Sequence, residues 1–426
     1  MTRIAVIGAG ITGITTAYAL VRQGYEVTVF DRNRYAAMET SFANGGQLSA
    51  SNAEVWNSWA TVKKGIKWMF RKDAPLLMNP MPSWHKYSWM AEFVANIPNY
   101  EKNTIATTRL AIEARKHMFE IAKAEGIDFD LERRGILHIY RTAKGYDHAA
   151  RVNKLLEAGG LERNPVSAAE IRNIEPALTG PLYGGFFTPS DSTGDIHKFT
   201  RGLADACLKR GVTIICDADV RQLSHAADGV TVEWAEITRK GDDVKTEKTR
   251  FDGLIVCAGV ASRKFAAQLG DRVNIYPVKG YSITINLNDT QSQQAAPWVS
   301  LLDDDAKIVT SRLGAGRLRV AGTAEYNGEN RDIRYDRIKP LIDWSTELFP
   351  DMNTSSVVPW AGLRPMMPDM MPRVGPGKHP RVFYNTGHGH LGWTLSTATA
   401  EMVAGHVATA LPAEGKTSPA FRIAAE

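Results

Sequence analysis

The chain has 426 residues, of which 44% are hydrophobic and 23% are charged, and its formal net charge is +5. These values are those of an ordinary globular protein with a large core, and the length suggests two or three domains. A net charge this small does not indicate a protein that binds DNA or RNA through one basic face, so we expect no nucleic-acid partner.

Residues 3–31 predict a strand, a glycine-rich turn, a helix and a second strand, in that order. Arg3–Ile7 and Glu26–Phe30 are short β-branched runs, and residues 12–23 between them have helical composition and stop at Gly24. This order of elements is typical of the first βαβ unit of a nucleotide-binding domain.

The turn carries the G-x-G-x-x-G pattern at Gly8, Gly10 and Gly13. The first glycine allows the tight turn, the second lets backbone approach a pyrophosphate, and the third lets the helix pack close to the strand. The helix N-terminus offers unbonded N–H groups to the phosphates. Asp31 lies 18 residues after Gly13, near the spacing of a carboxylate that accepts hydrogen bonds from ribose hydroxyls. Together these features predict dinucleotide binding.

Residues 39–51 have the composition of a loop and include the sequence Asn44-Gly45-Gly46, which permits close approach of backbone to a ligand. Thr40, Ser41 and Asn44 could donate hydrogen bonds to cofactor oxygens. The alternative interpretation is a surface turn. The position of the segment just after the second strand favours a cofactor loop.

Residues 56–100 combine tryptophans with basic residues, namely Trp56, Trp59, Trp68, Trp84 and Trp89 with Lys63, Lys64, Lys67, Arg71 and Lys72. This combination suits a surface that lies in a membrane interface. It also suits a helical region whose tryptophans pack in the core and whose lysines lie in water. Both interpretations stay open at this point.

The rest of the chain mixes helical and antiparallel strand patterns. We predict helices at residues 109–125, 196–210 and 337–349. The predicted strands are 136–140, 184–188, 212–216, 230–237 and 246–251 (a hairpin across residues 240–243), 254–260, 276–286, 307–313 and 317–326. The glycines at 314 and 316 fit a hairpin turn better than a second phosphate loop.

This arrangement predicts an α/β plus α+β fold, in which a discontinuous Rossmann-like nucleotide-binding domain contains an inserted antiparallel-sheet substrate domain. We assign residues 1–50, 170–275 and 355–426 to the first domain, and residues 51–169 and 276–354 to the second. The three cysteines, Cys207, Cys216 and Cys257, form no C-x-x-C pair and indicate a reducing compartment, so we expect the protein in the cytoplasm.

Several separated motifs carry a family resemblance. The N-terminal GAGITG with Asp31 resembles the FAD fingerprint of the D-amino acid oxidase-like flavoprotein superfamily. The blocks TSFANGGQLS, IKWMFRKDAPL, YPVKGYS, GLRPMMPD and NTGHGHLGWT look like those of the bacterial D-amino acid dehydrogenases and follow in the same order. The resemblance covers nearly the whole chain and implies a two-domain flavoenzyme with FAD lying extended between the domains.

The resemblance also implies which residues hold FAD. They are Gly8, Gly10, Ile11, Thr12, Gly13, Asp31, Arg32, Thr40, Ser41, Asn44, Gly45, Gly46, Gln47, Val220, Ala258, Gly259, Gly387, His388, Gly389, His390, Leu391 and Gly392. The backbone of Val220 corresponds to an adenine contact, and residues 387–392 correspond to a loop whose N–H groups face the flavin pyrimidine edge. Some relatives attach the flavin through a cysteine in the block equivalent to residues 362–369. This chain has no cysteine there, so non-covalent FAD is expected.

Two residues are candidates for contact with the substrate. Arg364 matches the arginine that binds the substrate carboxylate, and a planar guanidinium suits that task because it forms two parallel hydrogen bonds. A structural ion pair is the alternative for Arg364. Tyr281 is a candidate for a second carboxylate or amine contact, with a tyrosine of the inter-domain core as the alternative. His388 and His390 do not predict a metal site, because no nearby cysteine or acid completes one.

The implied activity is oxidative deamination of a D-amino acid to a 2-oxo acid and ammonia, with electrons passed to a quinone-type acceptor. Residues 56–100 would then place the protein peripherally on the cytoplasmic face of the inner membrane. The main alternative is the same fold oxidising another amine, such as hydroxyproline or an N-substituted amino acid, with O₂ as acceptor. An NAD-linked dehydrogenase and a non-catalytic flavin-bound scaffold are further alternatives.

Overall fold

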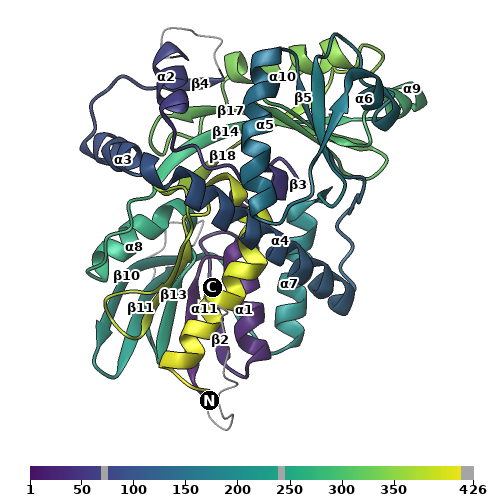
Figure 1. Cartoon of the computed structure of the whole chain (residues 1–426). Coiled ribbons are helices and arrows are strands. Elements are labelled where there is room, and N and C mark those ends of the chain that lie inside the picture. The colour runs from purple at the N-terminus through teal and green to yellow at the C-terminus, as the bar shows by residue number, and fades with distance from the viewer. Residues whose placement is uncertain (69–74, 238–244, 414–426) are drawn as a thin grey trace.

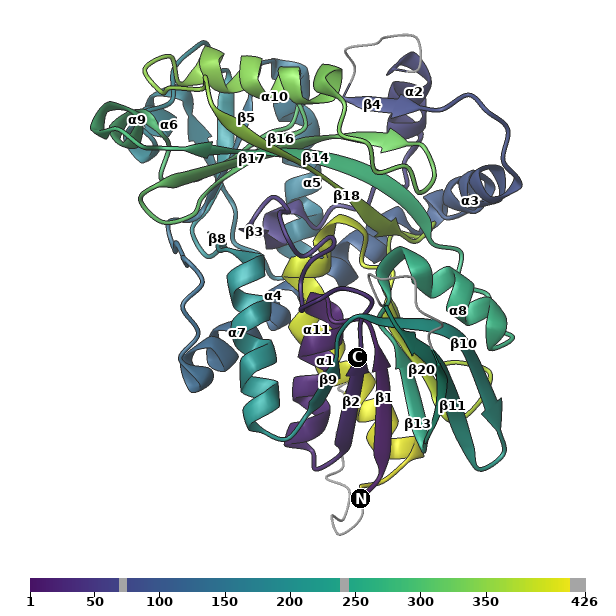
Figure 2. The same cartoon turned by 180° about the vertical axis from the view of Figure 1, so that it is seen from behind.

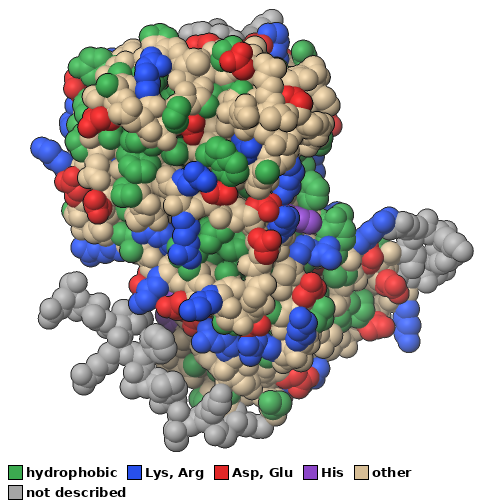
Figure 3. Space-filling view, turned by 90° about the vertical axis from the view of Figure 1, so that its right-hand side faces the viewer, with side chains coloured by type: hydrophobic (Ala, Val, Ile, Leu, Met, Phe, Trp, Pro, Cys, Tyr) green, Lys and Arg blue, Asp and Glu red, His purple; other side chains and the backbone are tan. Residues whose placement is uncertain are grey.

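The computed structural model describes residues 1–68, 75–237 and 245–413 and divides into two stacked lobes (Figure 1). The predicted hairpin turn at residues 240–243, together with Arg71 and Lys72, lies outside the described residues, as does the side chain of Trp68. On the face in Figure 3, lysine and arginine side chains are interspersed with aspartate and glutamate over both lobes.

A six-stranded sheet forms the centre of the lower lobe. Its order is β19 (Arg373–Pro376), β20 (Val382–Thr386), β13 (Gly253–Val256), β1 (Arg3–Ile7), β2 (Glu26–Phe30) and β9 (Thr213–Ile215), parallel except for β19. The chain leaves β1 toward β2 on one side and returns as β13 on the other. A crevice therefore opens at the carboxyl end of β1, which points toward the upper lobe (Figure 2).

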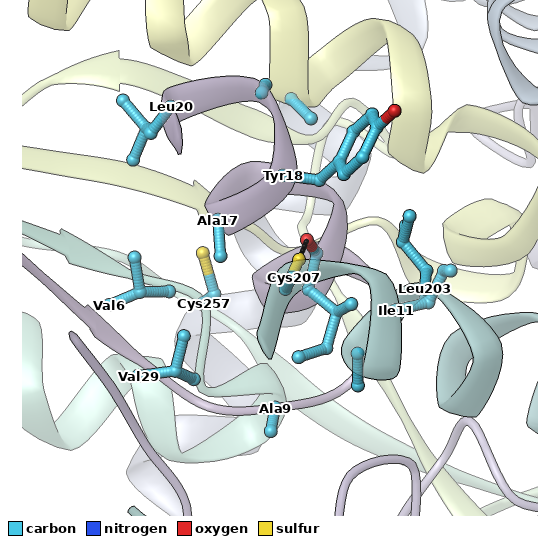
Figure 4. Packing of buried hydrophobic residues seen from close by; sticks show 14 of the residues in the cluster. Val6, Ala9, Ile11, Ala17, Tyr18, Leu20, Val29, Leu203, Cys207 and Cys257 are labelled. Carbon is cyan, nitrogen blue, oxygen red and sulfur yellow. Dashed lines mark hydrogen bonds between the residues drawn. The ribbon is translucent and has the colours of Figure 1, made fainter. Parts of the chain in front are cut away.

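Helix α1 (Ile11–Arg22) packs on this sheet and against two later helices, α7 (Ile196–Lys209) and α11 (Gly392–Ala410), of which α11 also contacts the sheet at β19 and β20. Figure 4 shows the buried side chains that meet there, from α1 (Ile11, Ala17, Tyr18, Leu20), from α7 (Leu203, Cys207), from β1 and β2 (Val6, Val29), and Cys257 just after β13. Helix α4 (Tyr100–Glu125) covers α11 from the far side. The lobe thus joins segments from both ends of the chain.

A three-stranded antiparallel sheet extends the lower lobe, in the order β10 (Ala218–Ala226), β11 (Gly229–Glu236) and β12 (Thr246–Phe251). The predicted pairing of the last two strands is confirmed by their register. Helix α8 (Ser262–Gln268) follows a short 3₁₀ turn η3 (Gly259–Ala261) at the end of β13.

The upper lobe is built on a nine-stranded, mainly antiparallel sheet. Its order is β18 (Val357–Met366), β14 (Tyr276–Asn286), β17 (Arg317–Tyr326), β16 (Ile308–Arg312), β15 (Ser300–Asp303), β5 (Ile136–Tyr140), β7 (Gly184–Thr188) and β6 (Asn164–Ser167), with β4 (Leu76–Met78) beside β17. Helix α10 (Tyr335–Leu348) covers the face away from the lower lobe (Figure 2). Helices α5 (Ala143–Ala158), α6 (Ala168–Ile174) and α9 (Thr290–Ala295) lie around the same sheet.

The predicted fold class is confirmed, but sheet membership divides the chain differently at two places. Strands β7 and β18 pair within the upper sheet, although residues 170–275 and 355–426 were assigned to the nucleotide-binding domain. The reason is that β18 finds its partner in β14 and β7 finds its partner in β5, both of them upper-lobe strands. Two short strands, β3 (Gln47–Leu48) and β8 (Ser192–Thr193), connect the lobes.

Residues 56–100 fold as α2 (Trp59–Trp68), β4, α3 (Trp84–Ala95) and a 3₁₀ turn η2 (Ile97–Asn99) at one side of the upper lobe (Figure 1). Trp89 is buried beside Tyr276 and Tyr326, whereas Trp59 is 59% exposed and Trp84 is 85% exposed. The core interpretation therefore holds for Trp89, and contact of the exposed tryptophans with a membrane stays a prediction. No helix in the described part of the chain is long and apolar enough to cross a bilayer.

Candidate functional site

A cavity of about 970 Å³ lies between the lobes, at the upper end of the ~300–1,000 Å³ range of small-molecule sites. It runs from Asp31 and Val220 in the lower lobe to Arg364 and His390 beneath the upper sheet. Every residue predicted to contact FAD is part of its wall except Gly13. The structure thus brings together residues as distant in the sequence as Gly8 and Gly392.

The three fingerprint glycines have different tasks. Gly8 has φ +106°, and a Cβ there would lie 2.7 Å from the carbonyl oxygen of Cys257. At Gly13 a Cβ would lie 1.8 Å from the carbonyl oxygen of Gly8, so this glycine lets α1 pack on β1 and does not reach the cavity. Its packing role is therefore supported, and its predicted contact with FAD stays a prediction. A Cβ at Gly10 would meet only the Ser41 hydroxyl, at 3.4 Å, which leaves the cavity side open for a cofactor.

Asp31 lies at the lower end of the cavity, and its carboxylate accepts three hydrogen bonds from the protein. Oδ2 accepts the Ala9 N–H at 2.6 Å, and Oδ1 accepts the backbone and side-chain N–H groups of Asn33 at 2.8 and 2.9 Å. Burial raises the pKa of this carboxyl from its usual value, and the N–H groups oppose that shift. A carboxylate has about four acceptor positions, so one is left for a ribose hydroxyl.

The loop after β2 lines the cavity with its backbone, while its side chains hold it in place. Thr40 donates to the Leu363 carbonyl at 2.8 Å, Ser41 accepts the Ile11 N–H at 3.0 Å, and Asn44 accepts the Gly46 N–H at 2.9 Å. These bonds connect the loop to α1 and to β18. The segment is a wall of the cavity, so the alternative of a plain surface turn does not apply.

The loop before α11 forms the wall at the other end. Gly387 and Gly389 have φ +77° and +58°, which a side chain rarely adopts, and η4 (Gly389–Leu391) leads into the helix. The N-terminus of α11 therefore faces the cavity, where its partial positive charge favours an electron-rich group.

The two histidines of this loop have separate partners and share no ligand. His388 Nε2 lies 2.9 Å from the Thr399 hydroxyl, and His390 Nε2 lies 3.4 Å from the Asn52 carbonyl oxygen. His390 also stacks on Trp56, with ring centroids 4.7 Å apart. Burial lowers the pKa of His388 to about 3 and that of His390 to about 4, so both rings are neutral at physiological pH.

Arg364 reaches the cavity from β18. Its guanidinium lies against the backbone of β14, where a Cβ at Gly280 would come within 2.3 Å of it, and it donates to the Thr323 carbonyl at 3.1 Å. Burial lowers its pKa to about 10, which still leaves it positively charged at neutral pH. Among the described residues no carboxylate pairs with it, so the alternative of a structural ion pair does not hold. A buried cation without an anion is costly unless a ligand supplies one.

Tyr281 belongs to the wall of the cavity, but its side chain points away from the cavity, which argues against the predicted substrate contact. Successive residues of β14 alternate between faces, and Ser282 faces the cavity side, where it donates to the Ala43 carbonyl at 3.0 Å. The ring of Tyr281 therefore lies on the opposite face, in the apolar cluster beneath α10. Its hydroxyl donates to Glu325 Oε2 at 2.6 Å. The alternative of a core tyrosine is the correct one.

Two aromatic residues of the site were not predicted. Trp56 lines the cavity through its stack on His390, and His85 lines it from α3 with Nε2 2.9 Å from the Ile275 carbonyl oxygen. Burial lowers the pKa of His85, so it is also neutral. The cluster of tryptophans indicated an unusual segment but gave no sign of which one faces a ligand.

The residues present fit FAD. The cavity extends from the crevice at the carboxyl end of β1 to the Arg364 guanidinium. Gly10 has no side chain that would fill the space where the phosphates would lie. Asp31 keeps one acceptor position for a ribose hydroxyl. Residues 362–369 contain no cysteine. Burial raises the pKa of the Cys207 and Cys257 thiols to about 12, so neither is a reactive thiolate.

Residues 3–405 match the family described as FAD dependent oxidoreductase, and the chain belongs to that family. Its cofactor is FAD, held without a covalent bond. Within the family the chain groups with the D-amino acid dehydrogenases. D-amino acid dehydrogenase 3 of Mesorhizobium japonicum is 64% identical over 98% of this chain and 99% of its own length. The D-amino acid dehydrogenase of Paramagnetospirillum magneticum is 40% identical over 94% of both chains.

Solved structures agree on the fold. Glycine oxidase from Geobacillus kaustophilus superposes with a TM-score of 0.75 at 18% identity, covering 100% of this chain and 98% of the other. L-proline dehydrogenase from P. horikoshii gives a TM-score of 0.73 at 16% identity, covering 97% and 96%. At such identities the likeness concerns the architecture and not the substrate.

Proposed function

We propose that this enzyme oxidises D-amino acids to 2-oxo acids and ammonia and passes the electrons to a quinone-type acceptor. The observation that carries the proposal is the Arg364 guanidinium, buried at the flavin end of the cavity with no carboxylate partner among the described residues. The names of the relatives support the D configuration and the dehydrogenase type.

The chain's own residues prepare the substrate for oxidation. Arg364 binds the carboxylate through two parallel hydrogen bonds and thereby fixes the direction of the Cα–H bond. The neutral rings of Trp56, His85 and His390 exclude water around it and add no competing charge. When bound, FAD supplies the acceptor for the hydride that leaves the substrate Cα. The resulting imino acid then reacts with water to give the 2-oxo acid and ammonia.

The test is an anaerobic mixing experiment with the purified flavoprotein. We expect D-amino acids to bleach the flavin absorbance and their L enantiomers to leave it unchanged, with one ammonia formed per turnover in the presence of a quinone analogue. Bleaching by hydroxyproline or N-methyl amino acids alone would favour the alternative amine substrate. Rapid peroxide formation in air would identify O₂ as the acceptor and contradict the quinone assignment.

The exposed part of residues 56–100 supports the acceptor proposal. We define the aromatic surface as Trp59, Ile66, Met81, Trp84 and Tyr87, which are 59%, 52%, 68%, 85% and 49% exposed. Lys63, Lys64 and Lys67 of α2 lie beside it, and Ala60, Thr61 and Lys64 also line the cavity. Aromatic and basic side chains together are typical of a surface that binds an anionic bilayer, so this surface would present the cavity to a quinone dissolved there.

Removing the two exposed tryptophans should weaken binding to the membrane without changing the rate of substrate oxidation. We expect Trp59→Ser with Trp84→Ser to weaken binding to vesicles of anionic lipid by about tenfold, because two interface anchors are lost. Turnover with vesicle-embedded quinone should fall in parallel, and turnover with a soluble dye should not. The matched control is Tyr183→Ser, where the side chain is 54% exposed just before β7, at the other end of the upper sheet from β4. Equal vesicle binding by the variant and the parent would contradict the assignment.

A further inference from the structure

A hydrogen-bonded chain of three buried side chains lies beneath the flavin end of the cavity. Ser49 Oγ is 3.0 Å from Ser51 Oγ, and Ser51 Oγ is 2.8 Å from His138 Nε2. Ser49 follows β3, Ser51 lies in the 3₁₀ turn η1 (Ala50–Asn52), and His138 lies in β5. All three are buried. We call this set the serine–histidine chain.

The chain connects two cavities. Ser49 is part of the wall of the large cavity, whereas Ser51 and His138 are part of the wall of a second cavity of about 30 Å³. That volume is roughly the share of one water molecule in the liquid. Glu54 and His148 also line the small cavity. A proton at Ser49 could therefore reach this cavity through hydrogen bonds alone.

The surroundings fix the geometry of the serine–histidine chain. Asp191 accepts the Ala50 and Ser51 N–H groups at 3.0 Å each and pairs with Arg115 at 2.8 Å. Ser49 Oγ accepts the Asn52 N–H at 3.1 Å, and the Ser49 N–H donates to the Thr394 hydroxyl at the start of α11. A fully bonded buried polar network of this kind is rigid and is costly to maintain for packing alone.

The proposed reaction requires a path along which a proton can leave the substrate. A D-amino acid enters largely as its ammonium form, and hydride can leave Cα only after the nitrogen has lost a proton to give a lone pair. Among the described residues, the rings that line the site beside Arg364, His85 and His390, are neutral and have Nε2 committed to backbone carbonyl groups. Ser49 of the serine–histidine chain lines the same cavity, and its hydroxyl is bonded to a second hydroxyl that is able to pass a proton onward.

We propose, on the basis of the function above, that the serine–histidine chain conducts the proton that the substrate ammonium loses. As the ammonium gives a proton to Ser49 Oγ, the Ser49 proton passes to Ser51 and the Ser51 proton passes to His138 Nε2. The imidazolium then releases its other N–H proton to water in the small cavity. The chain resets when the two hydroxyls turn back and the ring returns to its first tautomer by exchanging protons with that water. The overall change is R–NH₃⁺ to R–NH₂ and one proton delivered to water, with no oxidant or reductant involved.

The groups around His138 disfavour the charged form of its imidazole, as expected for a residue that passes a proton on. Burial and the nearby Arg163 hold the pKa of its imidazole well below the usual range, Lys307 acts in the same direction, and Asp304 opposes it. Glu54, His148 and Tyr140 face the small cavity from neighbouring segments. A proton arriving at Nε2 is therefore unstable there and moves on.

The test compares the rate of anaerobic flavin reduction by a D-amino acid at pH 7 and at pH 10.5. We expect Ser51→Ala to reduce the rate at pH 7 by about 100-fold, the lower end of what positioned proton transfer contributes. The deficit should shrink to about twofold at pH 10.5, where the substrate arrives as the free amine, and the loss of charge on Arg364 at that pH affects the parent and the variant alike. Ser51→Thr keeps a hydroxyl and should recover most of the rate, and His138→Asn should resemble Ser51→Ala.

The matched control is Ser345→Ala in α10, which also removes a buried hydroxyl that donates to a backbone carbonyl, at 2.7 Å, on the far side of the upper sheet. It should leave the rate unchanged at both pH values. A deficit of Ser51→Ala that is equal at pH 7 and pH 10.5 would show a structural role and overturn the proposal. Failure of any D-amino acid to reduce the parent flavin would instead overturn the proposed function, and this inference with it.

Discussion

Arg364→Ala will raise the KM for a D-amino acid by about two to three orders of magnitude while FAD stays bound. The reason is that truncating one partner of a buried, hydrogen-bonded charge pair costs about 2–5 kcal/mol, and each 1.4 kcal/mol is about tenfold in affinity. The side chain lies at the substrate end of the cavity, away from the fingerprint glycines, so the flavin spectrum should not change. Steady-state kinetics with the purified variant, checked by its absorbance, measures both quantities.

Two further variants sharpen this prediction. Arg364→Lys keeps the charge but loses the planar fork, so its KM should lie between those of the parent and the alanine variant. Gly280→Ala should also raise KM, because its Cβ would lie 2.3 Å from the guanidinium and would displace it. A KM within twofold of the parent for Arg364→Ala would remove this residue from carboxylate binding.

Gly13→Ala will prevent the protein from folding into a flavin-binding form. The new Cβ would lie 1.8 Å from the carbonyl oxygen of Gly8 and 2.9 Å from its carbonyl carbon, and both atoms belong to backbone. Helix α1 would have to move away from β1, which disturbs the central cluster of the lower lobe and costs about 3 kcal/mol or more. Thermal unfolding followed by circular dichroism should show a large fall in Tm or loss of soluble protein.

The neighbouring Gly10→Ala is the matched variant, because its Cβ meets only the Ser41 hydroxyl at 3.4 Å. We expect this variant to fold with a Tm close to that of the parent apoprotein but to bind FAD about 10- to 100-fold more weakly, since the methyl group occupies the open phosphate wall. Titration of the apoprotein with FAD gives the affinity. If both glycine variants lost stability equally, the division of tasks between Gly10 and Gly13 would be contradicted.

The elements that follow from local sequence were predicted well. Strands β1 and β2 and helix α1 depend on short-range patterns, such as a β-branched run or a glycine at a tight turn, and these are legible in the chain itself. Strand β14 was located residue for residue on the same basis. Arg364 lines the cavity as expected, because its type and its surrounding motif pointed to a carboxylate.

The orientation of Tyr281 could not be predicted from the sequence. Strand β14 is buried on both faces for most of its length, so its hydrophobic pattern does not say which face a residue occupies. That choice depends on β17 and β18, which follow far along the chain. The membership of β7 in the upper sheet depends in the same way on a distant partner. In the serine–histidine chain, one hydrogen bond joins Ser51 and His138, which are 87 positions apart. A local sequence pattern cannot predict such a contact.

The neighbouring positions of α1 and α11 have a consequence for biosynthesis. The hydroxyl of Tyr25 donates to the Leu411 carbonyl at 2.9 Å, and the strand that precedes α11 pairs with β13 in the same sheet as β1. The complete cofactor site therefore forms only after the loop before α11 has been synthesised. A chain that stops before this loop would expose the apolar side of α1 to proteases and chaperones.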